Sequence, residues 1–126
     1  MDLTPLIPSG RQIVESYGEG RFRITNQLYT SPVLVFPERT LAWPVTRFAE
    51  ASLENLEPIL AAGRASEVEL LLFGQGPQMQ LVPPALRQSL RDAGVVVEPM
   101  DTGAACRTYN VLMADGRRVA AALIPV

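Results

Sequence analysis

The sequence predicts an α/β fold of three layers in a single domain, residues 1–126, with a mixed central β-sheet covered by helices and a small antiparallel β part near the N-terminus. Two observations support this class. In the second half, short apolar runs alternate with helical patterns, as in β-α-β units. In the first half, short strand-like segments are separated by glycine or proline, which favours antiparallel pairing. At this length, with 48% hydrophobic residues, the chain can bury a core without a disulfide or a metal ion.

The first half contains five segments with strand character. Gly18–Gly20 separates the first two, and the third continues the second or pairs with it. Val33–Phe36 is a short apolar run between two prolines, which is typical of a buried strand. Pro44 cannot donate to a sheet and places its segment at an edge. The expected strands are 12–17, 22–25, 27–30, 33–36 and 41–45.

The second half alternates strands with helices. Ser52 and Asn55 are the candidate N-caps of a short helix that ends at Gly63. Pro83 or Pro84 opens a second helix, which runs through residue 93. A third helix follows the N-cap Asp101 and ends at 115–116, and the expected strands are 68–73, 95–97 and 119–124.

Two residue types are absent from the sequence. It has no histidine and no lysine, so all eleven basic residues are arginines. Without histidine the chain cannot build a Ser-His-Asp or Cys-His catalytic group or a His-ligated zinc site. Without lysine it has neither Schiff-base chemistry nor a P-loop. We therefore expect no catalytic residues, no metal and no cofactor, which favours a binding protein over an enzyme.

Charge and hydropathy restrict the partners. The net charge is −2, and the arginines are scattered, with only Arg117 and Arg118 adjacent. A nucleic-acid binder usually carries a basic patch, so we expect no nucleic-acid partner. No apolar run approaches the ~18 residues that cross a bilayer, and the first residues do not resemble a secretory signal. The single cysteine, Cys106, cannot form an internal disulfide, and we expect a cytoplasmic protein.

The loop Gly74-Gln75-Gly76 follows a strongly apolar strand and is a candidate ligand site. With Glu98 at the end of the next strand it has the outline of a dinucleotide-binding unit. Met79 stands where that motif has its third glycine, and the next helix begins too late to face a phosphate. The competing interpretation is a tight turn, although strand ends of this kind also form small-ligand crevices.

The predicted third helix carries the other candidates. Cys106 near its start could be an activated thiol, but a buried core position is commoner for a free cysteine. Asp101 and Thr102 fit a helix cap better than a catalytic pair. Arg107, Thr108, Tyr109 and Asn110 are four consecutive hydrogen-bonding side chains in an otherwise apolar helix. They predict either a buried network that holds the helix or the lining of a groove.

Several segments resemble one family. The segment Met100–Asn110, with Glu69–Gly76, Trp43-Pro44 and Gly116–Pro125, is similar to the family of small proteins that includes the mitochondrial complex I (NADH:ubiquinone oxidoreductase) assembly factor 3. The resemblance covers nearly the whole chain. Its loop Phe73–Gly76 departs from the Gly-Thr-Gly-type loop usual in that family.

The resemblance implies a mixed sheet in three layers and no established activity or cofactor. It also implies a protein partner, because the mitochondrial member assists assembly of the peripheral arm of complex I together with a partner factor. The leading hypothesis is a non-enzymatic assembly factor, which would reach a membrane only through its partner. The alternative is a small-molecule-binding protein or weak enzyme that uses a crevice between Gly74–Gly76 and Cys106–Asn110. The expected binding residues are Gly74, Gln75, Gly76, Asp101, Thr102, Arg107, Thr108 and Asn110.

Overall fold

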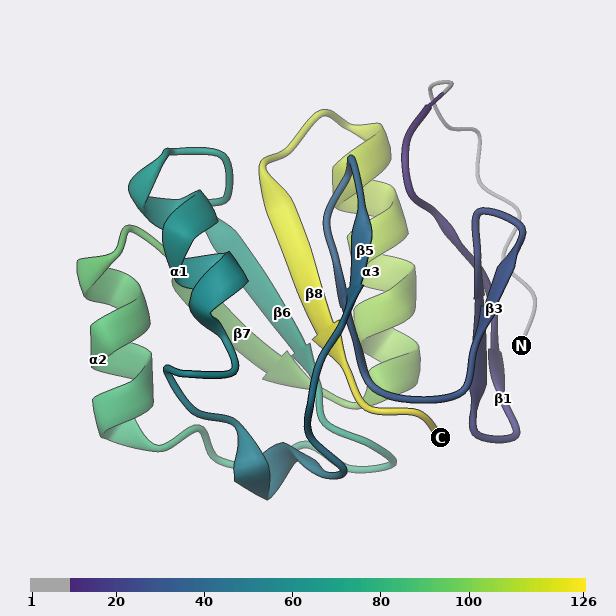
Figure 1. Ribbon diagram of the computed structural model, residues 1–126, viewed down its shortest axis with the longest axis horizontal. Coiled ribbons are helices and arrows are strands. Elements are labelled where there is room, and N and C mark those ends of the chain that lie inside the picture. Colours follow the sequence, from purple (N-terminus) through teal and green to yellow (C-terminus); the bar gives the residue numbers. More distant parts are fainter. Residues whose placement is uncertain (1–9) are drawn as a thin grey trace.

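A mixed five-stranded sheet forms the centre of the computed structural model, which describes residues 10–126 (Figure 1). The strand order is β5-β4-β8-β6-β7. Strands β6, β7 and β8 are parallel to one another, whereas β4 runs antiparallel to both β8 and β5. The strands are β4 (Val33–Val35), β5 (Thr40–Ala42), β6 (Leu70–Gly74), β7 (Val96–Met100) and β8 (Val119–Leu123). The predicted mixed sheet is confirmed.

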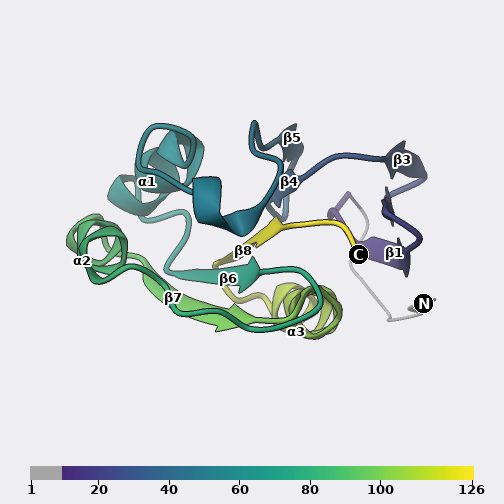
Figure 2. The ribbon, with the colours of Figure 1, turned by 90° about the horizontal axis from the view of Figure 1, so that it is seen from below.

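Helices cover both faces of this sheet, so the fold has three layers (Figure 2). Helices α1 (Glu57–Arg64) and α2 (Pro84–Asp92) share one hydrophobic core with the sheet, and α3 (Thr102–Ala114) packs on the opposite face. Strand β6 serves both cores because its side chains alternate: Leu71 and Phe73 enter the first and Leu72 the second. This two-sided burial explains the continuous apolar run of β6.

A small antiparallel sheet packs beside α3. It consists of β1 (Val14–Gly18), β2 (Arg21–Ile24) and β3 (Gln27–Tyr29) in that order. Two-residue turns join its strands, and both residues of each turn have positive φ, as type I′ hairpins require. Phe22 and Ile24 are fully buried against α3, whereas Arg21 and Arg23 alternate with them and are exposed. The third segment therefore pairs with the second instead of continuing it.

The first helix differs from its prediction at both ends. The N-cap of α1 is Leu56, with no side-chain bond, because the Asn55 amide is used elsewhere. Its oxygen accepts from Trp43 Nε1 at 3.0 Å, and its nitrogen donates to the Glu50 carbonyl at 2.9 Å. Gly63 does not end the helix but lies in its last turn, where a Cβ would come within 2.6 Å of the Ala93 carbonyl oxygen. Gly63 thus permits close contact between α1 and the end of α2.

Two smaller differences concern the loops and an edge strand. A 3-10 helix at Phe48–Glu50, absent from the prediction, places the Phe48 ring edge-on to Phe73 with 4.9 Å between ring centroids. Strand β7 extends to Met100 and includes Pro99, which a sheet tolerates at its edge. Within residues 10–126, no helix is long and apolar enough to cross a membrane.

Candidate functional site

The candidate site lies at the carboxyl edge of the parallel strands. Strands β6 and β7 are adjacent and parallel, with Gly74 paired to Met100. The Gly74–Gly76 loop and Asp101 therefore reach the same edge. The Gln75 N–H donates to the Met100 carbonyl at 2.9 Å and continues the ladder beyond the strands.

The loop and the start of α3 touch directly. The Thr102 hydroxyl accepts from Gly76 N–H at 2.9 Å and donates to the Ile124 carbonyl at 2.6 Å, while Thr102 N–H donates to the Gly76 carbonyl at 2.9 Å. A Cβ on Gly74 would lie only 3.1 Å from the Ala105 Cβ. Protein atoms thus fill the space between Gly74 and α3, and Gly74 makes room for the helix.

Gln75 organises the segment that follows. Its side chain is 2% exposed, and its Oε1 accepts from Gln80 N–H at 2.7 Å. The Gln80 side chain in turn donates to the Gln75 carbonyl at 3.3 Å. Among the described residues, the Gln75 Nε2 is buried without a hydrogen-bond partner. Gln75 therefore fixes the fold of residues 76–80, and it retains one unused donor.

Asp101 is the N-cap of α3, as predicted. Its carboxylate accepts from Ala104 N–H at 2.9 Å, which satisfies one of the free donors at the helix start. Asp101 is half-buried, and Thr108 in the next turns is half-buried as well. These two side chains remain partly accessible, unlike the fully buried Thr102.

The polar cluster on α3 attaches the helix to the small sheet. The Asn110 carboxamide accepts from Val14 N–H at 3.0 Å and donates to the Val14 carbonyl at 2.8 Å. The Tyr109 hydroxyl donates to the Gln12 carbonyl at 3.0 Å. Arg107 is exposed, and its guanidinium donates to the Tyr17 hydroxyl. The sequence left two alternatives for this cluster, a buried network or the lining of a groove. Tyr109 and Asn110 belong to a buried network.

Cys106 is a core residue. It is fully buried, and burial raises the pKa of its thiol from 9.0 to about 12, although Arg107 opposes the shift. Burial also raises the pKa of the Tyr109 hydroxyl. Both groups are therefore neutral at physiological pH, and the thiol lacks the thiolate character of a nucleophile. The described residues contain no cluster of three or more His, Cys, Asp or Glu side chains that could hold a metal ion.

Two exposed apolar side chains follow the Gly74–Gly76 loop. Met79 is 64% exposed and Leu81 is 91% exposed. They belong to the segment 74–86, which contains no charged residue. From the sequence, Met79 was considered only as the residue that replaces a motif glycine and Leu81 was not considered, although the uncharged run is a signal for both. They give the carboxyl edge an apolar surface next to the predicted loop.

The fold has experimentally determined neighbours. The solution structure of a Bordetella pertussis protein, described as a Mth938-like domain, matches with a TM-score of 0.82 and 33% sequence identity, covering 99% of this chain and 92% of that one. The protein is therefore a three-layer α/β domain of the Mth938-like type.

Residues 14–124 match the family described as "Protein of unknown function (DUF498/DUF598)", and the chain belongs to this family. An uncharacterised protein of Rhodobacter capsulatus is 36% identical over 118 residues, covering 94% of this chain and 88% of that protein. The NADH dehydrogenase [ubiquinone] 1 alpha subcomplex assembly factor 3 of Xenopus tropicalis is 34% identical over 112 residues, covering 89% of this chain. The match spans 60% of the length of the Xenopus protein. The family resemblance predicted from the sequence is confirmed.

Proposed function

We propose that this protein binds other proteins and assists the assembly of a membrane-associated complex of the respiratory, complex I-like kind, without catalysing a reaction. The observation that carries the proposal is the 34% identity to a relative named as a complex I assembly factor. Any association with a membrane would come through that protein partner.

The chemistry of the carboxyl edge supports binding over catalysis. The side chains of Thr102 and Asn110 form hydrogen bonds inside the protein, and Cys106 is buried, which raises the pKa of its thiol. The Gly74–Gly76 loop is packed against α3, so the small-molecule alternative lacks space at that point.

We place the partner surface at the same edge, on its accessible groups. Met79 and Leu81 would supply the apolar anchors, since interfaces bury such side chains at their centres. Asp101, Arg107 and Thr108 would supply polar contacts beside them. Gly74, Gln75, Gly76, Thr102 and Asn110 would support this surface through the internal bonds described above.

The test is affinity purification of the tagged protein from its native host, with mass spectrometry of the co-eluting proteins. Wild type is expected to recover subunits of one membrane-associated complex. The double variant Met79→Ser/Leu81→Ser should lose them, whereas the control Val96→Ser, at a position that is 48% exposed at the opposite, amino end of β7, should retain them. Recovery that is unchanged in the double variant would place the surface elsewhere, and recovery of no complex subunit by wild type would contradict the proposed function.

A further inference from the structure

The structure assigns a second protein-binding surface to the open edge of β3, where we propose that an extended acidic segment of a partner adds a fourth strand to the small sheet. This inference rests on the proposed function in one respect, namely that the partner is a protein. It adds the chemistry of the segment: carboxylates at alternate positions, recognised by Arg21 and Arg23.

The backbone of β3 presents unused hydrogen-bonding groups. The Thr25-Asn26 turn makes Ile24 and Gln27 the closing hydrogen-bonded pair of the β2–β3 hairpin. Because such pairs alternate along an antiparallel ladder, Arg23 and Leu28 form a pair without mutual hydrogen bonds. The N–H and C=O of Leu28 therefore point away from β2, toward the open edge.

The opposite edge of the small sheet is already occupied. Asn110 bonds to both the N–H and the C=O of Val14 in β1, as a neighbouring strand would. In Figure 2, β3 lies at the side of the small sheet away from α3. Leu28 is 52% exposed, and Thr30 and Ser31 beyond β3 are exposed as well. At Val14 the β1 side of this sheet is thus closed, whereas no bond to the outer edge of β3 is formed among the described residues.

Edge strand β7 of the central sheet is protected. Its Val96 N–H points to β6, where it donates to the Glu69 carbonyl at 3.0 Å. The backbone groups of Val97 and Pro99 therefore point to the open side of β7. Pro99 has no N–H to donate, and the Val97 carbonyl accepts from Arg87 at 3.1 Å. An added strand would meet a missing donor and an occupied acceptor there.

Edge strand β5 contains no charged residue of its own. Its nearest arginine, Arg39, lies with its guanidinium carbon 4.2 Å from the centroid of the Phe36 ring. Thr40 in the strand already donates to Gln12 at 2.7 Å. The Arg39 guanidinium is thus held over the Phe36 ring, and the Thr40 hydroxyl is engaged by Gln12.

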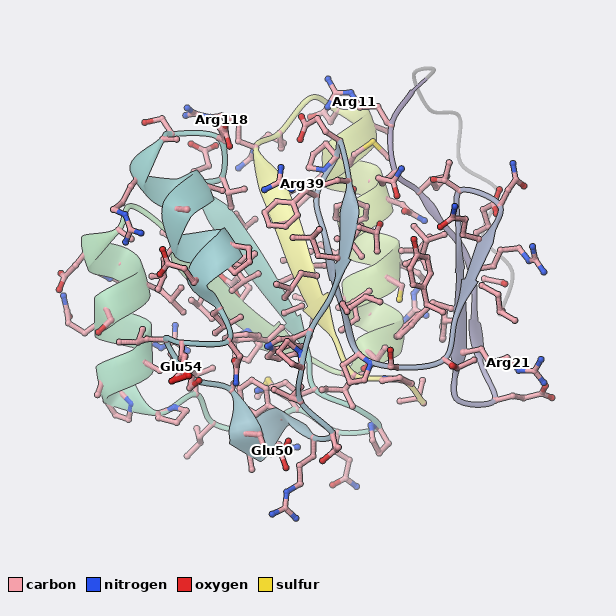
Figure 3. The ribbon with its side chains drawn as sticks, viewed as in Figure 1. Arg11, Arg21, Arg39, Glu50, Glu54 and Arg118 are labelled. Atoms are coloured by element: carbon pink, nitrogen blue, oxygen red, sulfur yellow. The ribbon has the colours of Figure 1, made fainter. Side chains whose placement is uncertain are left out.

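The outer face next to β3 is hollow, and its lining carries two arginines against one glutamate. A pocket of about 390 Å³ lies on it. The Arg23 guanidinium has no ion pair or hydrogen bond within residues 10–126. Arg21 meets Glu19 only at 3.7 Å, with both side chains more than half exposed, so that pair is weak. Figure 3 shows Arg21 pointing away from the rest of the molecule. The pocket is lined by Ser16, Tyr17, Gly18, Glu19, Arg21, Arg23 and Leu28.

Strand geometry fixes the spacing of the recognised carboxylates. A residue added beside Leu28 is two strand spacings, about 9–10 Å, from Arg23, a span that an extended arginine and a glutamate can bridge. The β2–β3 ladder ends at the pair Phe22–Tyr29, and one further step of the same register would set Arg21 opposite Thr30. Two carboxylates separated by one residue would therefore meet the two arginines, and the intervening apolar side chain would lie on the Tyr29 side. Although the whole protein has a net charge of −2, the two arginines of this face would attract an acidic segment locally.

The test uses a fluorescein-labelled peptide of alternating Glu and Val, with a Gln-Val peptide and a backbone N-methylated Glu-Val peptide as comparisons. Fluorescence anisotropy with wild type should show saturable binding of the first peptide that weakens with added salt. Arg21→Glu/Arg23→Glu should weaken it at least about tenfold, because two attractive charges become repulsive. The control Arg64→Glu on α1 should leave it unchanged. The Gln-Val and N-methylated peptides should both bind at least about tenfold more weakly.

Each other outcome overturns this inference. Equal affinity for the Glu and Gln peptides would remove the charge recognition, and equal affinity of the N-methylated peptide would remove the added strand. If no peptide binds and wild type instead dimerises in sedimentation, the edge belongs to a second copy of the chain. The same variant separates this inference from the proposed function. If Arg21→Glu/Arg23→Glu recovers complex subunits as well as wild type does, the assembly role stands and this edge is excluded as the binding surface.

Discussion

Asn110, near the middle of α3, satisfies both backbone groups of Val14 with one carboxamide. The two residues are 96 positions apart in the sequence, and both are buried. These two hydrogen bonds attach the small N-terminal sheet to α3, which packs on the central sheet. A residue expected to line a binding groove is thereby a main connection between two parts of the fold.

Replacing Asn110 with Leu should destabilise the protein by about 2–4 kcal/mol, because both Val14 groups would remain buried without partners. Urea denaturation measures the change. Thr108→Val, a half-buried neighbour on the same helix, should stay within about 0.5 kcal/mol of wild type. A loss of stability as small for Asn110→Leu as for Thr108→Val would show that water or another group replaces the carboxamide.

Gly63→Ala should destabilise the protein by about 1–3 kcal/mol, although alanine normally stabilises a helix interior. The added Cβ would lie 2.5 Å from Val95 Cγ2 and 2.6 Å from the Ala93 carbonyl oxygen. The matched variant Ala61→Gly, at an exposed position of α1, should cost about 1 kcal/mol through helix propensity alone. Thermal melting of both variants checks this, and a stabilised Gly63→Ala would mean that α1 shifts freely away from α2.

The variants Arg107→Ala and Tyr109→Ala should separate surface from core on α3. Tyr109 is fully buried, so its truncation should cost about 3–5 kcal/mol. Arg107 is exposed, and loss of its bond to the Tyr17 hydroxyl should cost at most about 1 kcal/mol. Denaturant titrations give both values. If Arg107→Ala unfolds the protein, the arginine is a structural brace and cannot be assigned to the partner surface.

Stability should fall between about pH 9 and 12, partly through Cys106. Burial raises the thiol pKa from 9.0 to about 12, so above pH 9 the unfolded chain releases a proton that the folded protein retains. Stability present below pH 9 is therefore lost as the pH rises toward the folded pKa. The Cys106→Ala variant should show a shallower loss over this range, measured by urea denaturation at several pH values. Identical slopes for the two proteins would contradict the burial of the thiol.

Local patterns in the sequence predicted most of the fold. Asp101 was identified as a helix cap because capping depends on residues within one turn. The buried strand β6 was evident because both of its faces are apolar.

Features that depend on distant partners were not predictable from local patterns. Asn55 has a side chain suited to an N-cap, but Trp43 and Glu50 engage it instead. The role of Gly63 depends on Ala93, the residue that follows the last residue of α2. In the candidate site, the sequence identified the polar residues of α3 but could not show that Asn110 is buried against Val14 while Arg107, although bonded to Tyr17, is exposed.

The most direct test of the proposed assembly role is to delete the gene in the native host and quantify the assembled respiratory complex by native gel electrophoresis. Deletion should lower the amount of assembled complex without changing the synthesis of its subunits. Re-expression of wild type or of Cys106→Ala should restore it, since no thiol chemistry is required, and Met79→Ser/Leu81→Ser should fail to restore it. Undiminished assembly in the deletion strain would contradict the central claim.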